Sequence, residues 1–389
     1  MGLAVAAYDT SGNLSVTQIL LRAEQPQFVY APGRTPASGR ALHDLHGDLD
    51  GDGYADVVAT DAKGGLRLHP GKGTGRFGAA RTIGTSGWKG ALVAHGGDFT
   101  GIGGGGPDGY EDYVVRFAGG RKLYLYPNSG LGTPFGRTKQ ELVRPSAGGA
   151  DQDWSRVRQL LLPGDLDGGS AYGYRGGNDL LVRECADATC TDAGLTLFRG
   201  RTRSDGSADQ TRPFDLGSPV RLGATGWRST TVLSMGDMNG DGVQDLVTRN
   251  ESTGRLALRP GRITRGAYSL GSSTPYATAG FSAAERPRLA SAGNVQGRVV
   301  TGSYTDPAGG PAVPYRQFRP TAGRSYGDFW ATTPADPART VRYVDADGTR
   351  RTTTCVTGCL LFHPGGRTAP SDPLLAGTAG WATTVTGIF

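Results

Sequence analysis

Residues 46–58 read HGDLDGDGYADVV, and residues 235–247 read MGDMNGDGVQDLV. In both stretches a Gly-Asp pair leads into a turn-forming run, which ends in a further Asp and an apolar segment. Gly and Asp favour turns, and a short apolar run after a turn is typical of a buried strand. The same phrase recurs at 96–115 as GGDFTGIGGGGPDGYEDYVV and at 163–182 as PGDLDGGSAYGYRGGNDLLV. Repetition of one turn and one strand predicts a repeat architecture.

Two weaker forms extend the series, AGNVQGRVVTGSY at 292–304 and VDADGTRRTTTC at 344–355. A second phrase of alternating apolar residues follows the acidic turns, as in GLRLHPG at 65–71 and RLALRPG at 255–261. A Trp also precedes several of the turns at a nearly constant distance. Each unit therefore contains about four short strands, and radial repetition of such units predicts an all-β chain folded as a β-propeller.

The two ends of the chain are complementary in this repeat. Residues 3–22 resemble the strands that follow an acidic turn, and residues 382–389 resemble the strand that leads into one. We therefore expect the N-terminal segment and residues 375–389 to share one blade, which closes the ring without a covalent link and leaves no exposed sheet edge. Two separate β-sandwiches are the competing architecture, but they would not explain complementary ends.

Counting the shared blade predicts one seven-bladed propeller over residues 1–389, with six or eight blades as alternatives. The expected repeat starts lie near residues 1, 48, 98, 165, 237, 294 and 345.

These repeats resemble the FG-GAP/VCBS family, the calcium-loop propellers also found in integrin alpha subunits. The resemblance covers nearly the whole chain, is strongest from 46 to 260 and is loose from 280 to 360. It implies calcium in the acidic turns. Similar repeats occur in lectins, adhesion proteins and non-catalytic domains attached to bacterial secreted enzymes, so the resemblance implies binding of a glycan or cell-surface ligand. Related propellers among polysaccharide lyases imply the rival function, a lyase or cyclase with its site in the central channel. A third alternative is a structural domain of a longer secreted protein.

The first acidic turn has the residue types of a calcium site. Asp48, Asp50, Asp52 and Asp56 occupy positions one, three, five and nine, and the carbonyl of Tyr54 could add a ligand. An all-oxygen cage suits calcium, whereas magnesium demands stricter octahedral geometry and zinc recruits His or Cys. Two carboxylates about 4 Å apart repel by about 4 kcal/mol at an effective dielectric of about 20. A divalent cation would remove that cost.

Three further turns carry candidate ligands. They are Asp237, Asn239, Asp241, Val243 and Asp245 in the second good loop; Asp98, Asp108, Tyr110 and Asp112 in a loop interrupted by IGGGGP; and Asp165, Asp167 and Asp179 in a loop that lacks the central acid. We expect two calcium ions and up to four. The alternative is that Asp and Gly merely form turns here.

No catalytic residue is assigned, because filled cages leave no open position for substrate, and the chain contains no HExxH. The enzyme question stays open at this point, with a non-catalytic chain favoured. Aromatic residues are the candidate ligand contacts. Trp88, Trp154, Trp227 and Trp381 recur at one position, where they either fill blade junctions or stack on sugar rings. Tyr172 and Tyr174 lie in a variable insertion, as recognition residues or as exposed turn residues.

Composition limits the setting of the protein. The 41 Lys and Arg residues are dispersed along the chain, which argues against a nucleic-acid partner, and no apolar run is long enough to span a membrane. The N-terminus lacks a signal peptide's cationic region, so we expect the sequence to begin after a processing boundary. Cys185/Cys190 and Cys355/Cys359 are expected to form disulfides across hairpins, rather than one four-thiolate zinc site. Disulfides imply a secreted, extracellular protein.

Overall fold

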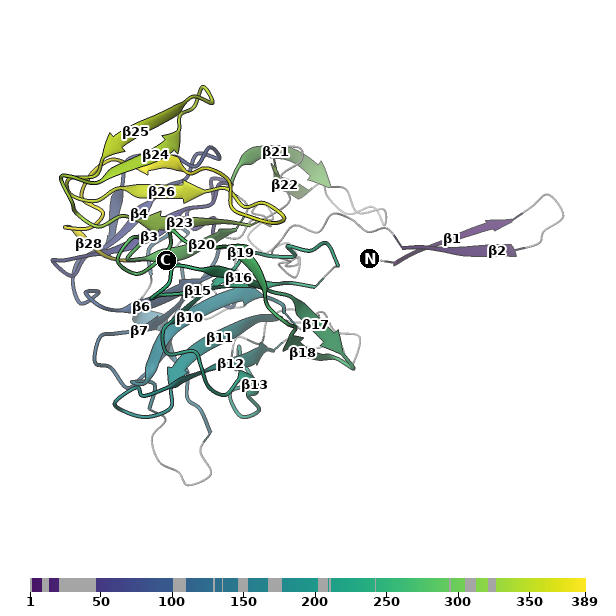
Figure 1. Cartoon of the computed structure of the whole chain (residues 1–389). Helices are drawn as coiled ribbons and strands as arrows, with labels where there is room; N and C mark the ends of the chain where they lie inside the picture. The colour runs from purple at the N-terminus through teal and green to yellow at the C-terminus, as the bar shows by residue number, and fades with distance from the viewer. Residues whose placement is uncertain are drawn as a thin grey trace.

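The structure is a computed structural model, drawn in Figure 1. It describes residues 2–8, 14–20, 47–100, 110–128, 130–134, 136–145, 153–166, 177–201, 209, 211–241, 243–293, 295–304, 313–320 and 327–389. Over these residues there is no α-helix, and the single helical element is a short 3-10 helix, η1 (Gly136–Thr138). The expectation of an all-β chain is confirmed. Within the same residues, no helix has the length and apolarity that a membrane span requires.

Five largely antiparallel sheets of four or more strands form a ring, which is the arrangement of a five-bladed β-propeller. We number the blades from one to five by the order of their second strands along the chain. In order of pairing, blade one contains β28 (Val385–Ile388), β3 (Val57–Asp61), β4 (Leu66–His69) and β5 (Arg81–Gly84), and blade two contains β6 (Leu92–His95), β7 (Tyr113–Arg116), β8 (Tyr124–Tyr126) and β9 (Gln140–Glu141). Blade three contains β10 (Val157–Gly164), β11 (Gly177–Cys185), β12 (Ala193–Gly200) and β13 (Val220–Gly223), and blade four contains β14 (Thr230–Ser234), β15 (Leu246–Asn250), β16 (Leu256–Arg259) and β19 (Thr274–Ala277). Blade five contains β20 (Leu289–Gly293), β23 (Asp328–Thr332), β26 (Leu360–His363), β27 (Leu374–Gly377), β24 (Thr340–Val344) and β25 (Arg350–Thr354).

Three hairpins lie outside these sheets. They are β1 (Gly2–Tyr8) with β2 (Leu14–Leu20), β17 (Gly261–Thr264) with β18 (Ala267–Leu270), and β21 (Gly297–Tyr304) with β22 (Val313–Pro320). The third of them lies between the first two strands of blade five. Its first strand is residues 297–304 of the weak phrase, and the hairpin separates β20 from β23, the strand that completes that repeat.

The prediction of seven blades, with six or eight as alternatives, is wrong. The repeats counted from 48, 98, 165, 237 and 294 each belong to one blade. In blades two to five the turn follows the first strand of the blade, whereas in blade one the turn precedes β3 and the first strand, β28, comes from the end of the chain. The segment near 345 is instead the turn between β24 and β25, a hairpin added to blade five. The same Asp-Gly chemistry serves a simple hairpin and a blade turn, so the pattern alone overcounts.

The last strand closes the ring, but its partner is not the N-terminal segment. β28 pairs with β3, with Val385 opposite Asp61 and Ile388 opposite Ala59. β1 and β2 pair with each other, and Figure 1 shows their hairpin apart from the ring. Non-covalent closure by the C-terminal strand is thus confirmed, whereas the expectation of a blade shared between residue 1 and residues 375–389 is wrong. Alternating apolar residues at 3–22 fit any hairpin, so they could not specify the partner.

A hydrophobic cluster fills each junction between successive blades. Each cluster draws side chains from the strands of two neighbouring blades and includes one large aromatic residue from the segment that joins them. These aromatic residues are Trp88, Trp154, Trp227, Phe281 and Trp381. Large aromatic side chains remove much apolar area from water, so one per junction stabilises the ring.

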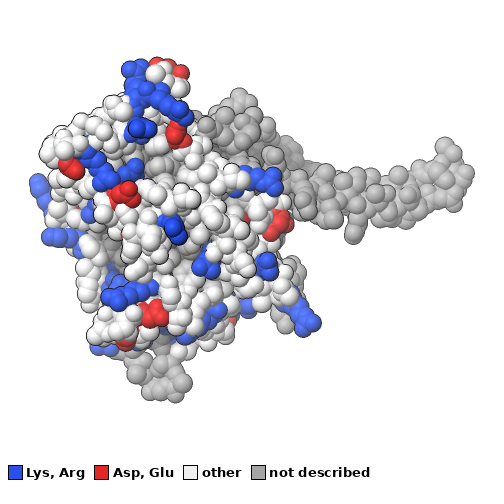
Figure 2. Space-filling model, viewed as in Figure 1, with Lys and Arg blue, Asp and Glu red and all other residues white. Residues whose placement is uncertain are grey.

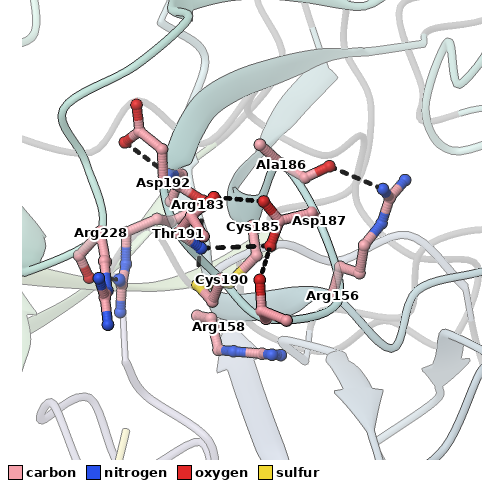
Figure 3. The surroundings of a disulfide bond; sticks show 12 residues. Arg156, Arg158, Arg183, Cys185, Ala186, Asp187, Cys190, Thr191, Asp192 and Arg228 are labelled. Atoms are coloured by element: carbon pink, nitrogen blue, oxygen red, sulfur yellow. Dashed lines mark hydrogen bonds between the residues drawn. A yellow bond between two sulfur atoms is a disulfide. The ribbon is translucent and has the colours of Figure 1, made fainter.

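The four cysteines form the two expected disulfides, Cys185–Cys190 and Cys355–Cys359, and none is free. Figure 3 shows the first of them in the turn between β11 and β12, where Asp187 accepts hydrogen bonds from Thr191. The zinc alternative is therefore wrong. A closed ring of about five or six residues stabilises the fold by about 2 kcal/mol in the chain-entropy account. Because disulfides persist where the surroundings are oxidising, they indicate such an environment for this chain.

Candidate functional site

One buried aspartate stands at the start of the second strand in every blade. We call these residues the bridging aspartates: Asp56, Asp112, Asp179, Asp245 and Asp328. One carboxylate oxygen of each accepts a backbone N–H from the beginning of its acidic turn, and the other accepts an N–H from the end of the third strand or just beyond it. The donors in the acidic turns are the N–H groups of Leu49, Phe99, Leu166, Met238 and Val295. The donors at or after the ends of the third strands are the N–H groups of Gly71, Asn128, Gly200, Gly261 and Gly365. The ten N···O distances are 2.7 to 3.0 Å.

The second donor is glycine in four of the five blades, and in blades one and four close approach to the backbone explains why. A Cβ atom added at Gly71 would lie 2.0 Å from the carbonyl oxygen of Ala55, and one added at Gly261 would lie 2.1 Å from that of Gln244. No side chain fits at either distance. The Pro-Gly that ends the phrases at 65–71 and 255–261 is therefore part of the same hydrogen-bonded unit as the acidic turn.

Burial makes the bridging aspartates costly as anions. Desolvation raises the pKa of Asp245 to about 7, and it raises the pKa of Asp56 and Asp112 well above the usual range, with added repulsion from Asp50 and Asp98 respectively. The backbone N–H groups oppose this shift, because they stabilise the charged form. Four of these residues, Asp56, Asp112, Asp179 and Asp245, were predicted to be metal ligands, and the structure gives them and Asp328 a hydrogen-bonding role.

The first loop gathers three carboxylates. One oxygen each from Asp48, Asp50 and Asp56 lies within 4.8 Å of the other two. Asp48 is held by the backbone N–H groups of Gly51 and Gly53, both at 2.8 Å. Gly53 has a φ of 93°, which side-chain-bearing residues rarely adopt, so glycine lets the backbone turn around the carboxylate here.

The remaining contacts of this loop also orient its acids. Asp50 accepts a hydrogen bond from Arg81 of β5 at 3.1 Å, and this ion pair offsets part of the negative charge. Asp52 accepts the backbone N–H of Tyr54 at 2.9 Å.

This donor set fits a calcium ion. Two oxygens bound to one calcium at about 2.3–2.6 Å are at most about 5 Å apart, and the three carboxylates meet that limit. Each carboxylate oxygen has two lone pairs, so an oxygen that accepts a backbone N–H can still bind a cation. Asp48, Asp50 and Asp56 would hold the ion, and Asp52 with the carbonyl of Tyr54 stay predicted ligands.

The acidic turn at 237–245, called the second loop here, holds its acids differently from the first loop. Among the described residues, a group of three close carboxylates is found in the first loop alone. In the second, the amide of Asn239 donates to Asp241 at 3.0 Å, and Asp241 accepts the backbone N–H of Val243 at 2.9 Å. Asp237 accepts the N–H of Gly240 at 2.7 Å. These bonds hold the three side chains in a turn, and calcium binding here stays a prediction.

The other two loops are described in part. Asp98 and Tyr110 are described, as is Asp165, and Asp112 and Asp179 are bridging aspartates. Four predicted residues lie outside the described residues: Asp108, Asp167, Tyr172 and Tyr174. Calcium binding at these loops, and recognition by the two tyrosines, therefore stay predictions.

The four tryptophans are packed inside the protein. Trp88, Trp154, Trp227 and Trp381 are all at least nine-tenths buried. Three of them lie over a glycine four residues earlier, so close that a Cβ at Gly84 would come within 2.3 Å of the indole of Trp88. The indole N–H of Trp154 donates to the carbonyl of Leu142 at 3.0 Å. These rings expose no face to a sugar, so the structure favours junction packing.

A cavity of about 310 Å³ lies at the centre of the ring, among the first strands of all five blades. Arg158, Arg183, Arg249, Arg288 and His95 line it. The sequence did not indicate this cluster, because its residues come from four different blades. On the face drawn in Figure 2 the Lys and Arg side chains are scattered, so the gathering of arginines at the cavity is a local feature.

His95 faces this cavity but is engaged with Glu111. His95 Nδ1 lies 3.1 Å from Glu111 Oε2, and Glu111 also accepts the backbone N–H of Gly47 at 2.7 Å. Burial lowers the pKa of His95 to about 4 and raises the pKa of Glu111 to about 8. Burial thus disfavours the charged form of each group, and the hydrogen bonds of Glu111 to His95 and Gly47 tie blade two to the first loop.

Comparisons with known proteins return no matching family model, no matching curated protein and no matching solved structure. The resemblance to FG-GAP/VCBS repeats accordingly stays a prediction from the sequence.

Proposed function

We propose that this chain is a secreted, calcium-stabilised propeller that acts as a non-catalytic binding module for a glycan or another cell-surface ligand. The observation that carries the calcium proposal is the meeting of Asp48, Asp50 and Asp56 within 4.8 Å. Three anions at this distance repel one another, and a bound cation would reverse the sign of that interaction. The two disulfides support an extracellular setting.

The central cavity supports binding better than catalysis. The side chains that line it, within the described part of the chain, include no Asp, Glu, Lys, Tyr or Cys. His95 is the one candidate general base among them, and its pKa is lowered to about 4 by burial. A base works best when its pKa lies near the working pH. The cavity therefore has groups that can hold a ligand and a poor group for proton transfer.

An enzyme remains the second candidate, because His95 and four arginines line one cavity. Their positions in the strands argue against a joint role. His95 ends β6, whereas Arg158 lies at the start of β10 and Arg288 directly precedes β20. The side-chain amide of Gln159 in β10 donates a hydrogen bond to the carbonyl of Val232 in β14 and accepts one from its backbone N–H. These two bonds place the starts of the neighbouring first strands side by side. His95 and the arginines are thus at opposite ends of the cavity.

Calcium is tested by titration calorimetry and thermal unfolding of wild type, Asp50→Ala and Asp241→Ala. We expect Asp50→Ala to bind one calcium fewer than wild type and to lose most of the rise in Tm that calcium produces. Asp50 is chosen because it is not a bridging aspartate, and Asp347→Ala, in an exposed turn, is the matched control. A wild-type Tm that chelation leaves unchanged, or an unchanged stoichiometry in Asp50→Ala, would contradict the proposal.

Ligand binding is tested on a glycan array with calcium and with chelator. We expect the protein to be retained by one class of glycan and the retention to fall when calcium is removed, because the loops that shape the ring lose their counter-charge. The Asp50→Ala variant should behave in calcium as wild type does in chelator. Absence of retention across all glycans would count against a glycan-binding module and in favour of a structural domain.

A further inference from the structure

Four arginines gather at one end of the central cavity. Arg158 lies at the start of β10, and Arg288 directly precedes β20. Arg183 and Arg249 lie near the ends of the second strands β11 and β15. First strands run toward the acidic turns and second strands return, so all four residues are at the end of the ring opposite those turns.

The arginines of the second strands follow the repeat. The fourth residue after the bridging aspartate is Arg116, Arg183 and Arg249 in blades two, three and four, and it is Thr60 and Thr332 in the other two blades. Equivalent positions in a strand face the same way in every blade. Positive charge is thus concentrated over three neighbouring blades.

Counter-charge at this end of the cavity is incomplete. Glu251 lies 3.9 Å from Arg183 and 3.8 Å from Arg249, so one carboxylate is shared between two guanidinium groups. In the part of the chain that the structure describes, Arg158 and Arg288 form hydrogen bonds to backbone carbonyls and no ion pair. Among the described residues, Glu251 is therefore the one carboxylate paired with these four arginines.

Donor groups remain available around the cavity. The Nε of Arg183 is buried and has no hydrogen-bond partner among the residues that the structure describes. A guanidinium has five N–H donors, and Arg158 uses one nitrogen, Nη1, for its contacts with Ser155 and Val157. Burial lowers the pKa of Arg183, and repulsion from Arg158 acts in the same direction, so a bound anion would relieve both costs. Figure 3 shows Arg158 and Arg183 beside the hairpin of the Cys185–Cys190 disulfide.

We infer that the arginine end of the central cavity binds an oxyanion, namely the carboxylate, sulfate or phosphate group of a ligand. Planar guanidinium groups bind such oxyanions through paired N–H bonds. The cavity volume of about 310 Å³ is at the lower end of the range for small-molecule sites, which suits one acidic sugar unit. The inference rests on the proposed binding function and deepens it, because it names acidic glycans as the ligand class.

The test is calorimetric titration of the full chain with sulfate, phosphate and glucuronate at fixed ionic strength in chloride, with glucose as the neutral control. We expect saturable binding of at least one anion and none of glucose. Arg158→Gln should weaken that binding about tenfold or more, because it removes a charge-assisted hydrogen bond. Arg158 is exposed and its known contacts are to carbonyls, so this variant should fold. Arg221→Gln, an exposed arginine on β13, is the control and should bind as wild type.

The three anions distinguish the source of the oxyanion. Preference for glucuronate assigns a uronic acid, preference for sulfate a sulfated sugar, and preference for phosphate a phosphorylated ligand. Each titration is repeated in chelator: anion binding that survives there supports this site even if the calcium proposal fails. Lack of binding by wild type to all three anions, or equal affinities of wild type and Arg158→Gln, would overturn the inference.

Discussion

Replacement of Asp328 by Ala is expected to lower the free energy of unfolding by about 3 kcal/mol or more, since each buried backbone N–H left without an acceptor costs about 1–3 kcal/mol. Asp328 is 4 % exposed and accepts the N–H groups of Val295 at 2.9 Å and Gly365 at 2.8 Å. Its removal leaves both donors unpaired and releases the turn after β20 from the turn after β26. Urea unfolding followed by far-UV circular dichroism measures the change.

Two comparisons separate the hydrogen-bonding role from other causes. Asp328→Asn keeps one acceptor oxygen, so it should lose about half as much stability as Asp328→Ala. Asp372→Ala removes an exposed carboxylate that pairs with the exposed Arg350, and we expect a change within about 0.5 kcal/mol. Asp328 is not a predicted calcium ligand, so chelation should leave the Asp328→Ala difference unaltered. A loss below about 1 kcal/mol would show that the bridge is dispensable.

The acidic turns, the strands after them and the propeller class could be predicted because they depend on local spacing. Asp and Gly at alternating positions form turns in any context, and apolar pairs after Asp56 or Asp245 form buried strands. The close cysteine pairs were equally local. Their partners lie four and five residues away, within the same turn.

Features that depend on distant partners were missed or misassigned. The second donor to Asp56 is 15 residues away, and the one to Asp328 is 37 residues away, so the bridging role could not be read from one loop. Asp328 itself was not predicted as part of a repeat, because the β21–β22 hairpin separates it from β20. One signal in the sequence could have indicated this role. A Pro-Gly or Pro-Asn pair follows the third strand in four of the five repeats, and hydrophobic packing does not explain that recurrence.

The blade count failed for a related reason. A hairpin turn at 345 and a blade turn at 48 use the same residue types, and their sequences do not record which strand lies next to them. The number of aromatic residues at the blade junctions, five, equals the number of blades. Phe281 was not predicted as one of them because the recurring residue elsewhere is Trp, although Gly280-Phe281 occupies the position that Gly-Trp has at three of the other four junctions.

Deletion of residues 383–389 should abolish cooperative unfolding, which is the largest effect we expect. The deleted segment includes β28, whose Val385 and Ile388 pack in the cluster with Trp330 and Phe362. Residue Phe389 also exchanges two backbone hydrogen bonds with Val58, at 2.9 and 3.2 Å. Without them β3 becomes an open edge beside an exposed apolar junction, which favours association with other chains. Thermal unfolding and size-exclusion chromatography report both consequences.

The matched control is deletion of residues 1–20, the β1–β2 hairpin that pairs only with itself among the described strands. That variant should unfold within a few degrees of the full chain, because no strand of the ring loses its neighbour. Ile388→Ala gives a graded version of the C-terminal change, with an expected loss of about 2–5 kcal/mol for a buried aliphatic side chain. If the N-terminal deletion unfolds the protein while the C-terminal deletion does not, the ring is closed by the first segment of the chain and the pairing of β28 with β3 is not what holds it together.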